Sequence, residues 1–218
     1  MSVLLAVRLI NVLGALLLFT MLLILASGQL YRAIYAVAAQ AVLLGIAGAV
    51  LGAATGNIDL WVIAGITIVV KAILLPWLLI RVVKRINIGR DIEPVIPINV
   101  TLLFAAGIVV LAFHLSASLG SVRQAITGNA LPVGIALILL GVLVMASRRK
   151  ALVQMVGLFA SENGIFFTAM AISQGMPLII EIGVILDVVL GALVMGIFVL
   201  RVRSSVDTDI ADLESLKG

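Results

Sequence analysis

Seven stretches of this chain are long enough and apolar enough to cross a lipid bilayer. A spanning helix needs about 20 predominantly apolar residues. The stretches that approach this length are residues 3–26, 31–54, 59–83, 98–119, 128–147, 151–173 and 177–201. Only helices and closed β-barrels satisfy every backbone group in lipid, and these stretches lack the alternation of barrel strands. The sequence therefore predicts an all-α integral membrane protein with about seven transmembrane helices.

The composition excludes several classes of protein. With 64% hydrophobic and 11% charged residues, the chain is not a soluble globular domain. It contains no cysteine, so we expect no disulfide and no iron–sulfur ligation within it. Its single histidine, His114, cannot build a metal site alone. The net charge of +4 is better explained by membrane topology than by nucleic-acid binding, so no nucleic-acid partner is expected.

The basic residues predict how the chain is oriented. Seven spans place most of them on one side of the membrane, namely Arg32, Arg81, Lys84, Arg85, Arg90, Arg148, Arg149, Lys150, Arg201, Arg203 and Lys217. The other side receives only Arg8 and Arg123. Cytoplasmic loops carry the excess of lysine and arginine. We therefore predict an external N-terminus and a cytoplasmic C-terminus, in the inner (cytoplasmic) membrane of the cell.

Four ionisable residues lie inside the apolar spans: Lys71, Glu162, Glu181 and Asp187. An ionised group near the bilayer centre costs roughly 2.5–3.5 kcal/mol on insertion scales, and such residues usually mark ion pathways. We therefore interpret these four residues as candidate ion-translocation sites. The alternative interpretation is structural, in which each charge pairs with a group on another helix and moves nothing.

Lys71 is placed far from water on both sides. It lies about midway between Asp59 and Arg81, roughly 15–18 Å from either end at about 1.5 Å per residue. A lysine side chain does not reach that far, so simple snorkelling does not explain this residue. Pro76, five residues later, lacks a backbone N–H and is expected to kink the helix. The sequence does not identify the carboxylate that faces Lys71.

Further polar residues are candidates for relay support between these charges. They are Asn163, Ser161, Gln40, Thr67 and His114. Asn163 follows Glu162 directly, and small residues from Gly157 to Gly164 allow another helix to approach closely. His114 lies near the outer end of the fourth span, where an ordinary interfacial histidine is the simpler interpretation.

The motifs around these charges resemble a known family. The stretch Ser161-Glu162-Asn163-Gly164, followed by Glu181-Ile182-Gly183 and Asp187, resembles the E component of the hydrogenase-4 type of membrane-bound formate hydrogenlyase. The helix from Lys71 to Pro76 and the terminal Leu-Lys-Gly are also similar to that family. The resemblance covers most of the chain in hydropathy and in the order of its spans.

The last three spans resemble the three-helix K-type subunit of respiratory complex I. The shared pattern is a basic turn, here Arg148-Arg149-Lys150, followed by two helices that each carry an acidic residue. One departure lies in the sixth span, where Gly157-Leu158-Phe159 replaces the Gly-Leu-Glu of complex I and the acid follows at Glu162. The expected organisation is therefore an N-terminal four-helix region (1–127), a K-like region (128–203) and an amphipathic cytoplasmic tail (204–218).

The resemblance implies a non-catalytic subunit of a complex I-related hydrogenase that couples electron transfer to proton or sodium translocation. The nickel–iron site and the iron–sulfur clusters would lie in peripheral partner subunits, and antiporter-like and complex I-like core subunits would adjoin this chain in the bilayer. Two alternatives remain open. One is a free-standing ion antiporter or secondary transporter, although no internal repeat is evident. The other is a purely structural scaffold subunit.

Overall fold

The computed structural model describes residues 2–86, 94–118, 129–173 and 191. The helices in these residues are α1 (Val3–Ala26), α2 (Leu30–Thr55), α3 (Ile58–Thr67), the π-helix η1 (Ile68–Leu74), α4 (Leu75–Ile86), α5 (Ile98–Ser118), α6 (Ala130–Ser147) and α7 (Ala151–Ser173). Because α3, η1 and α4 follow one another without a break, the described part has six helices long and apolar enough to cross a membrane. The predicted all-α membrane class and the first six predicted spans are confirmed.

Several predictions fall on residues that the structure does not describe. The seventh span (177–201) lies outside the described residues apart from position 191, and the tail (204–218) lies wholly outside them. The boundary between the four-helix and K-like regions, between residues 127 and 128, falls at a gap in the description. The division into these regions and the seventh span therefore stay predictions. The external N-terminus also stays a prediction, because the fold does not determine which end of the bundle faces outward.

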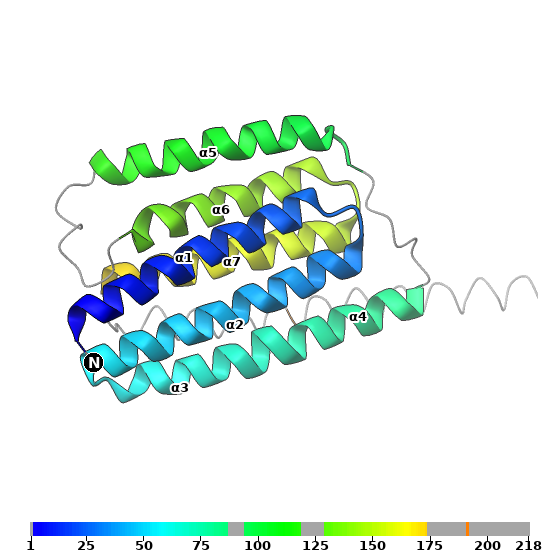
Figure 1. Cartoon of the computed structure of the whole chain (residues 1–218). Coiled ribbons are helices and arrows are strands. Elements are labelled where there is room, and N and C mark those ends of the chain that lie inside the picture. Colours follow the sequence, from blue (N-terminus) through cyan, green and yellow to red (C-terminus); the bar gives the residue numbers. More distant parts are fainter. Residues whose placement is uncertain (1, 87–93, 119–128, 174–190, 192–218) are drawn as a thin grey trace, which may run out of the picture.

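The helices run side by side as a bundle (Figure 1). Helix α2 packs against α1, α3 and α7, while α6 packs against α1, α5 and α7. Short turns reverse the chain between neighbours, and Gly56 closes α2 with a φ of 71°, in the left-handed region that favours glycine. One end of the bundle carries the α1–α2 turn, the α6–α7 turn and the end of α4 (Figure 1). The predicted clustering of basic residues thus has a structural counterpart, with Arg32, Arg81 and Arg148 at this end.

Helices α6 and α7 make the most extensive contact among the described helices, and glycines line it. A Cβ atom built on Gly164 would lie 2.9 Å from the carbonyl oxygen of Gly134, and one on Gly157 would lie 2.8 Å from that of Gly141. The two glycines of each helix are seven residues apart, which is two turns and therefore the same face. The close approach expected of Gly157 and Gly164 is confirmed, and this packing fixes the helix that carries Glu162.

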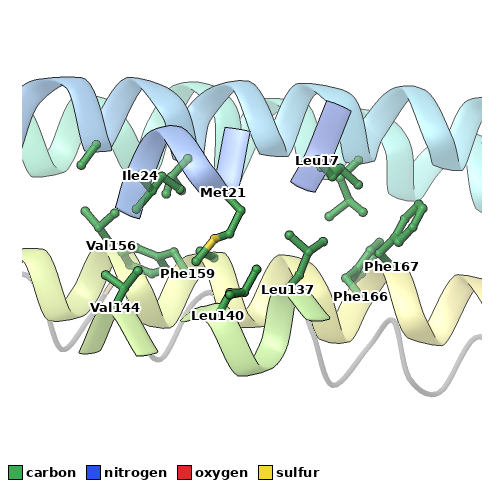
Figure 2. Packing of buried hydrophobic residues seen from close by; sticks show 14 of the residues in the cluster. Leu17, Met21, Ile24, Leu137, Leu140, Val144, Val156, Phe159, Phe166 and Phe167 are labelled. Carbon is green, nitrogen blue, oxygen red and sulfur yellow. The ribbon is translucent and has the colours of Figure 1, made fainter. Parts of the chain in front are cut away.

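The apolar core draws on every α-helix of the described bundle, and one part of it lies where α1, α6 and α7 meet. Leu17 and Met21 of α1 are fully buried against Leu137 of α6 and Phe159 of α7 (Figure 2). The outward faces are apolar as well, as Leu103 and Val110 of α5 show by their exposure. This arrangement suits a bundle surrounded by lipid, where an outward face needs no polar residues.

The third span is not a uniform helix. Its middle is the π-helix η1, where the backbone N–H of Leu75 donates to the carbonyl of Val70, five residues earlier. Pro76 follows directly and has no N–H to offer the preceding turn. Wide turns of this kind often occur at functional sites in helices. The expected disturbance near Pro76 therefore takes the form of a π-helix, and it contains Lys71.

Candidate functional site: a buried ion pair at mid-membrane depth

The structure pairs Lys71 with Glu162. The Nζ atom of Lys71 lies 3.1 Å from Oε1 of Glu162, and the two side chains are only 6% and 5% exposed. Lys71 lies near the middle of the span Ile58–Lys84, and Glu162 near the middle of Ala151–Met170. The pair therefore lies at about half the depth of the bundle. The carboxylate that faces Lys71, which the sequence left open, is that of Glu162.

Two local features place these side chains together. The first is the π-helix, which holds Lys71 on the buried side of the third span. The second is Gly45 of α2, which has no side chain and so lets Ile68 of the π-helix approach closely. A Cβ atom added at Gly45 would lie 2.5 Å from Cγ1 of Ile68. Since α2 also packs on α7, this close approach brings the π-helix to the side of the bundle where Glu162 lies.

An aromatic ring completes the surroundings of the ammonium group. The Nζ atom of Lys71 lies 5.5 Å from the centroid of the Phe166 ring. Phe166 follows Glu162 by four residues and therefore shares its face of α7. A cation above an aromatic face is attracted by the ring quadrupole. Lys71 thus meets a carboxylate and a ring offered by successive turns of one helix.

A second polar contact lies beside the pair. Asn163 is 1% exposed, and its Nδ2 donates to Oε1 of Gln40 on α2 over 3.5 Å. The Nε2 of Gln40 in turn donates to the carbonyl of Leu17 on α1 over 3.4 Å. Adjacent residues of α7 thus point toward different helices, with Glu162 facing the π-helix and Asn163 facing α2. Two of the candidate support residues, Asn163 and Gln40, are brought together.

The other candidate support residues have different surroundings. The hydroxyl of Ser161 donates to the carbonyl of Ile138 over 2.9 Å and so belongs to the α6–α7 contact. Thr67 is buried one turn before Lys71. His114 is exposed on α5, which packs mainly on α6 and contacts neither α2 nor η1 extensively, so the structure does not bring it to the pair. Glu181 and Asp187 lie outside the described residues.

Two residues of the bundle were not singled out for a specific role by sequence reasoning. Phe166 is one, and the sequence feature that could have identified it is its four-residue spacing from Glu162.

The other is Arg148, which the sequence presents only as part of a basic turn. Its side chain is 2% exposed, and its Nη2 donates to the carbonyl of Leu25 at the end of α1 over 2.6 Å. Burial lowers the pKa of Arg148 from its ordinary value.

Chemically, the pair combines a proton donor and a proton acceptor in an environment of low dielectric constant. The ammonium of lysine can lose a proton, and a carboxylate can take one. Their attraction is stronger here than at a wet surface, and removing one partner takes the opposite charge away from a buried group. The structure therefore shows a buried ion pair in which each charge depends on the other.

Comparison with known proteins adds one relative. The sequence is 34% identical over 149 residues to a protein of Mycobacterium tuberculosis described as uncharacterized protein Rv0085. The matched region covers 67% of this chain and 68% of the mycobacterial protein. No family model matches the sequence, and no solved structure matches it.

Proposed function

The chain belongs to the same family as the mycobacterial protein Rv0085, and we propose that it is a membrane subunit of a complex I-related nickel–iron hydrogenase. In this proposal its buried charges form part of a pathway that moves protons, or sodium ions, while other subunits transfer electrons. The observation that carries the proposal is the Lys71–Glu162 pair at mid-membrane depth. The resemblance of the Ser161–Gly164 motif to the hydrogenase-4 E component supplies the class of complex.

The pair supports a role in ion movement because of where it lies. Ionisable residues inside membrane spans are rare, and they characteristically line ion or proton pathways. Lys71, Glu162, Asn163 and Gln40 all lie at similar depth on three neighbouring spans. A polar layer at one depth suits movement along the plane of the membrane. Asp187 would extend that layer, Glu181 would flank it nearer the outer end of its span, and further segments would lie in neighbouring subunits.

The assignment to a hydrogenase has a direct biochemical test. A tagged full-length chain, extracted from its native membrane in mild detergent, should co-purify with a nickel–iron subunit and with hydrogenase activity. The preparation should also contain larger antiporter-like membrane subunits. Isolation of the chain alone, with ion exchange activity after reconstitution, would support the free-standing antiporter instead.

The role of the pair in coupling is tested by Glu162→Gln, which keeps the size of the side chain and removes its charge. In membrane vesicles, the variant complex should still produce hydrogen and should fail to build a transmembrane ion gradient. The matched control is Asp59→Asn, which changes an exposed carboxylate at the start of α3. A full gradient in the Glu162→Gln vesicles would remove the ion-pathway role and leave a scaffold subunit.

A further inference from the structure

The outer face of the α1–α2 hairpin carries a groove that neither the core nor the ion pair uses. It has a volume of about 480 Å³ and is lined by Leu23, Ala26, Ser27, Arg32, Tyr35 and Ala36. The groove lies at the end of the two helices, beside the turn that joins them. Leu23, Ala26, Arg32 and Tyr35 are exposed, so the groove opens toward the surroundings of the bundle.

From its mouth inward, the groove changes from charged to apolar. Arg32 lies in the first turn of α2, and Ala36 lies four residues, or about 6 Å, deeper. On the opposite wall, Ala26 ends α1, and Leu23 lies about one turn deeper. The hydroxyl of Ser27 is already engaged, since it donates to the carbonyl of Gln29 over 2.8 Å. Arg32 is the one charged residue in the lining of the groove, and the hydroxyl of Tyr35 is a further polar group there.

The helix itself does not explain an arginine at this position. A cation in the first turn of a helix lies at the positive end of the helix dipole, which disfavours it. An anion beside Arg32 would reverse this effect. The nearby α6–α7 turn strengthens the positive potential, because Arg148 contacts the end of α1 and Arg149 is exposed next to it.

The size of the groove limits what can occupy it. An α-helix is about 10 Å across and rises about 5.4 Å per turn, so roughly one turn would fill the groove of about 480 Å³. A transmembrane helix of a partner subunit is several times longer. A lipid headgroup with the first part of its acyl chains matches the groove in volume. It also matches the groove in polarity, because the charged residue lies at the opening and the apolar residues lie deeper.

We propose that this groove binds an anionic phospholipid, with the phosphate on Arg32 and the acyl chains along Leu23 and Tyr35. The proposal is independent of the hydrogenase assignment, because it depends only on the α1–α2 hairpin and the neighbouring α6–α7 turn. The bound lipid would belong to the leaflet on the basic side of the bundle. It would remain with the protein when the bulk lipid is removed.

Two arginines at the same end of the bundle allow a matched test. The tagged full chain, with the subunits that accompany it, is purified in detergent, and retained phosphatidylglycerol is counted by mass spectrometry. Arg32→Gln should lose one retained molecule per chain, whereas Arg149→Gln, outside the groove, should keep it. Arg32→Lys preserves the charge and should retain most of the lipid. Equal retention in Arg32→Gln and the wild type would overturn the proposal, as would equal losses in both glutamine variants.

A second measurement applies even where Arg32→Gln does not assemble. A photo-reactive amino acid at position 35 is activated in nanodiscs of phosphatidylcholine containing phosphatidylglycerol. Cross-linking to phosphatidylglycerol in preference to phosphatidylcholine is the expected result. Cross-linking to another polypeptide would assign the groove to a protein partner, and equal labelling of both lipids would show an unspecific lipid contact. Either of these results would contradict the proposal.

Discussion

Lys71 and Glu162 form a buried ion pair, with Nζ 3.1 Å from Oε1 and both side chains almost fully buried. In the proposed pathway, a proton would move from Nζ to the carboxyl oxygen and leave both groups neutral. The Phe166 ring stabilises the charged ammonium without offering a competing acceptor. In the proposed ion pathway, these two groups are the residues on which function would depend most.

Replacement of Lys71 by arginine separates charge from proton exchange. A guanidinium keeps a positive charge opposite Glu162, but it does not deprotonate in proteins. We expect Lys71→Arg to assemble and to lose the proton movement that accompanies hydrogen production, measured with a pH-sensitive dye in sealed vesicles. Lys84→Arg, exposed near the end of α4, is the matched control and should behave as the wild type. Wild-type proton movement in Lys71→Arg would mean that this lysine releases no proton.

Single and double replacements of the pair distinguish stability from function. Glu162→Leu leaves the Lys71 charge buried without its carboxylate, which we expect to lower stability by about 3–5 kcal/mol. The double variant Lys71→Met/Glu162→Leu removes both charges and should regain most of that stability. Thermal unfolding in detergent measures both effects. The double variant should nevertheless remain uncoupled, and full coupling in it would favour the scaffold interpretation.

At the scale of the helices, two elements set the geometry of the pair. The π-helix Ile68–Leu74 orients Lys71, and the glycine-lined contact of α6 with α7 fixes the position of Glu162. Sequence reasoning predicted the spans and the disturbance near Pro76. It could not predict a π-helix. In an α-helix each backbone N–H donates to the carbonyl four residues earlier, and in a π-helix to the carbonyl five residues earlier. A uniformly apolar stretch contains no residue pattern that distinguishes the two. The pairing of Lys71 with Glu162 depends on tertiary packing for the same reason.

The α6–α7 contact is tested by adding one methyl group. In Gly157→Ala, the new Cβ would lie 2.8 Å from the carbonyl oxygen of Gly141, which is backbone and cannot move aside alone. We expect a loss of about 1–3 kcal/mol in stability, seen as a lower unfolding temperature in detergent. In the control Gly107→Ala on α5, the added methyl meets nothing within 4 Å. This variant should be unchanged or slightly more stable, and a comparable loss in both variants would contradict the packing described.

At the scale of the whole molecule, Arg148 links the ends of two helices that are far apart in sequence. Its guanidinium donates to Leu25 at the end of α1, and its backbone carbonyl accepts from the side chain of Gln154 at the start of α7. The sequence revealed the cluster of basic residues but not that one of them is buried, because burial depends on how α1 lies against α6. The clustering itself was predictable, since the alternation of short turns and long spans places those residues at one end.

The predicted orientation can be measured directly because the chain has no natural cysteine. A cysteine at Gly28, where an added side chain meets nothing within 4 Å, reports on the α1–α2 turn. A cysteine at Asn57 reports on the opposite end of α2. In intact cells, a membrane-impermeant maleimide should label Asn57→Cys and leave Gly28→Cys unlabelled. The reverse pattern would invert the topology inferred from the positive-inside rule.

The most direct measurement for the buried pair as an ion-pathway element is infrared difference spectroscopy on the proposed hydrogenase complex, purified with this chain in it. Spectra taken before and during hydrogen turnover should contain a change in carboxyl bands that disappears in Glu162→Gln and persists in Asp59→Asn. Such a change would show that Glu162 alters its proton or its partner as the complex works. Identical carboxyl difference bands in the wild type and Glu162→Gln would contradict the account, because the buried pair would then be a static ion pair.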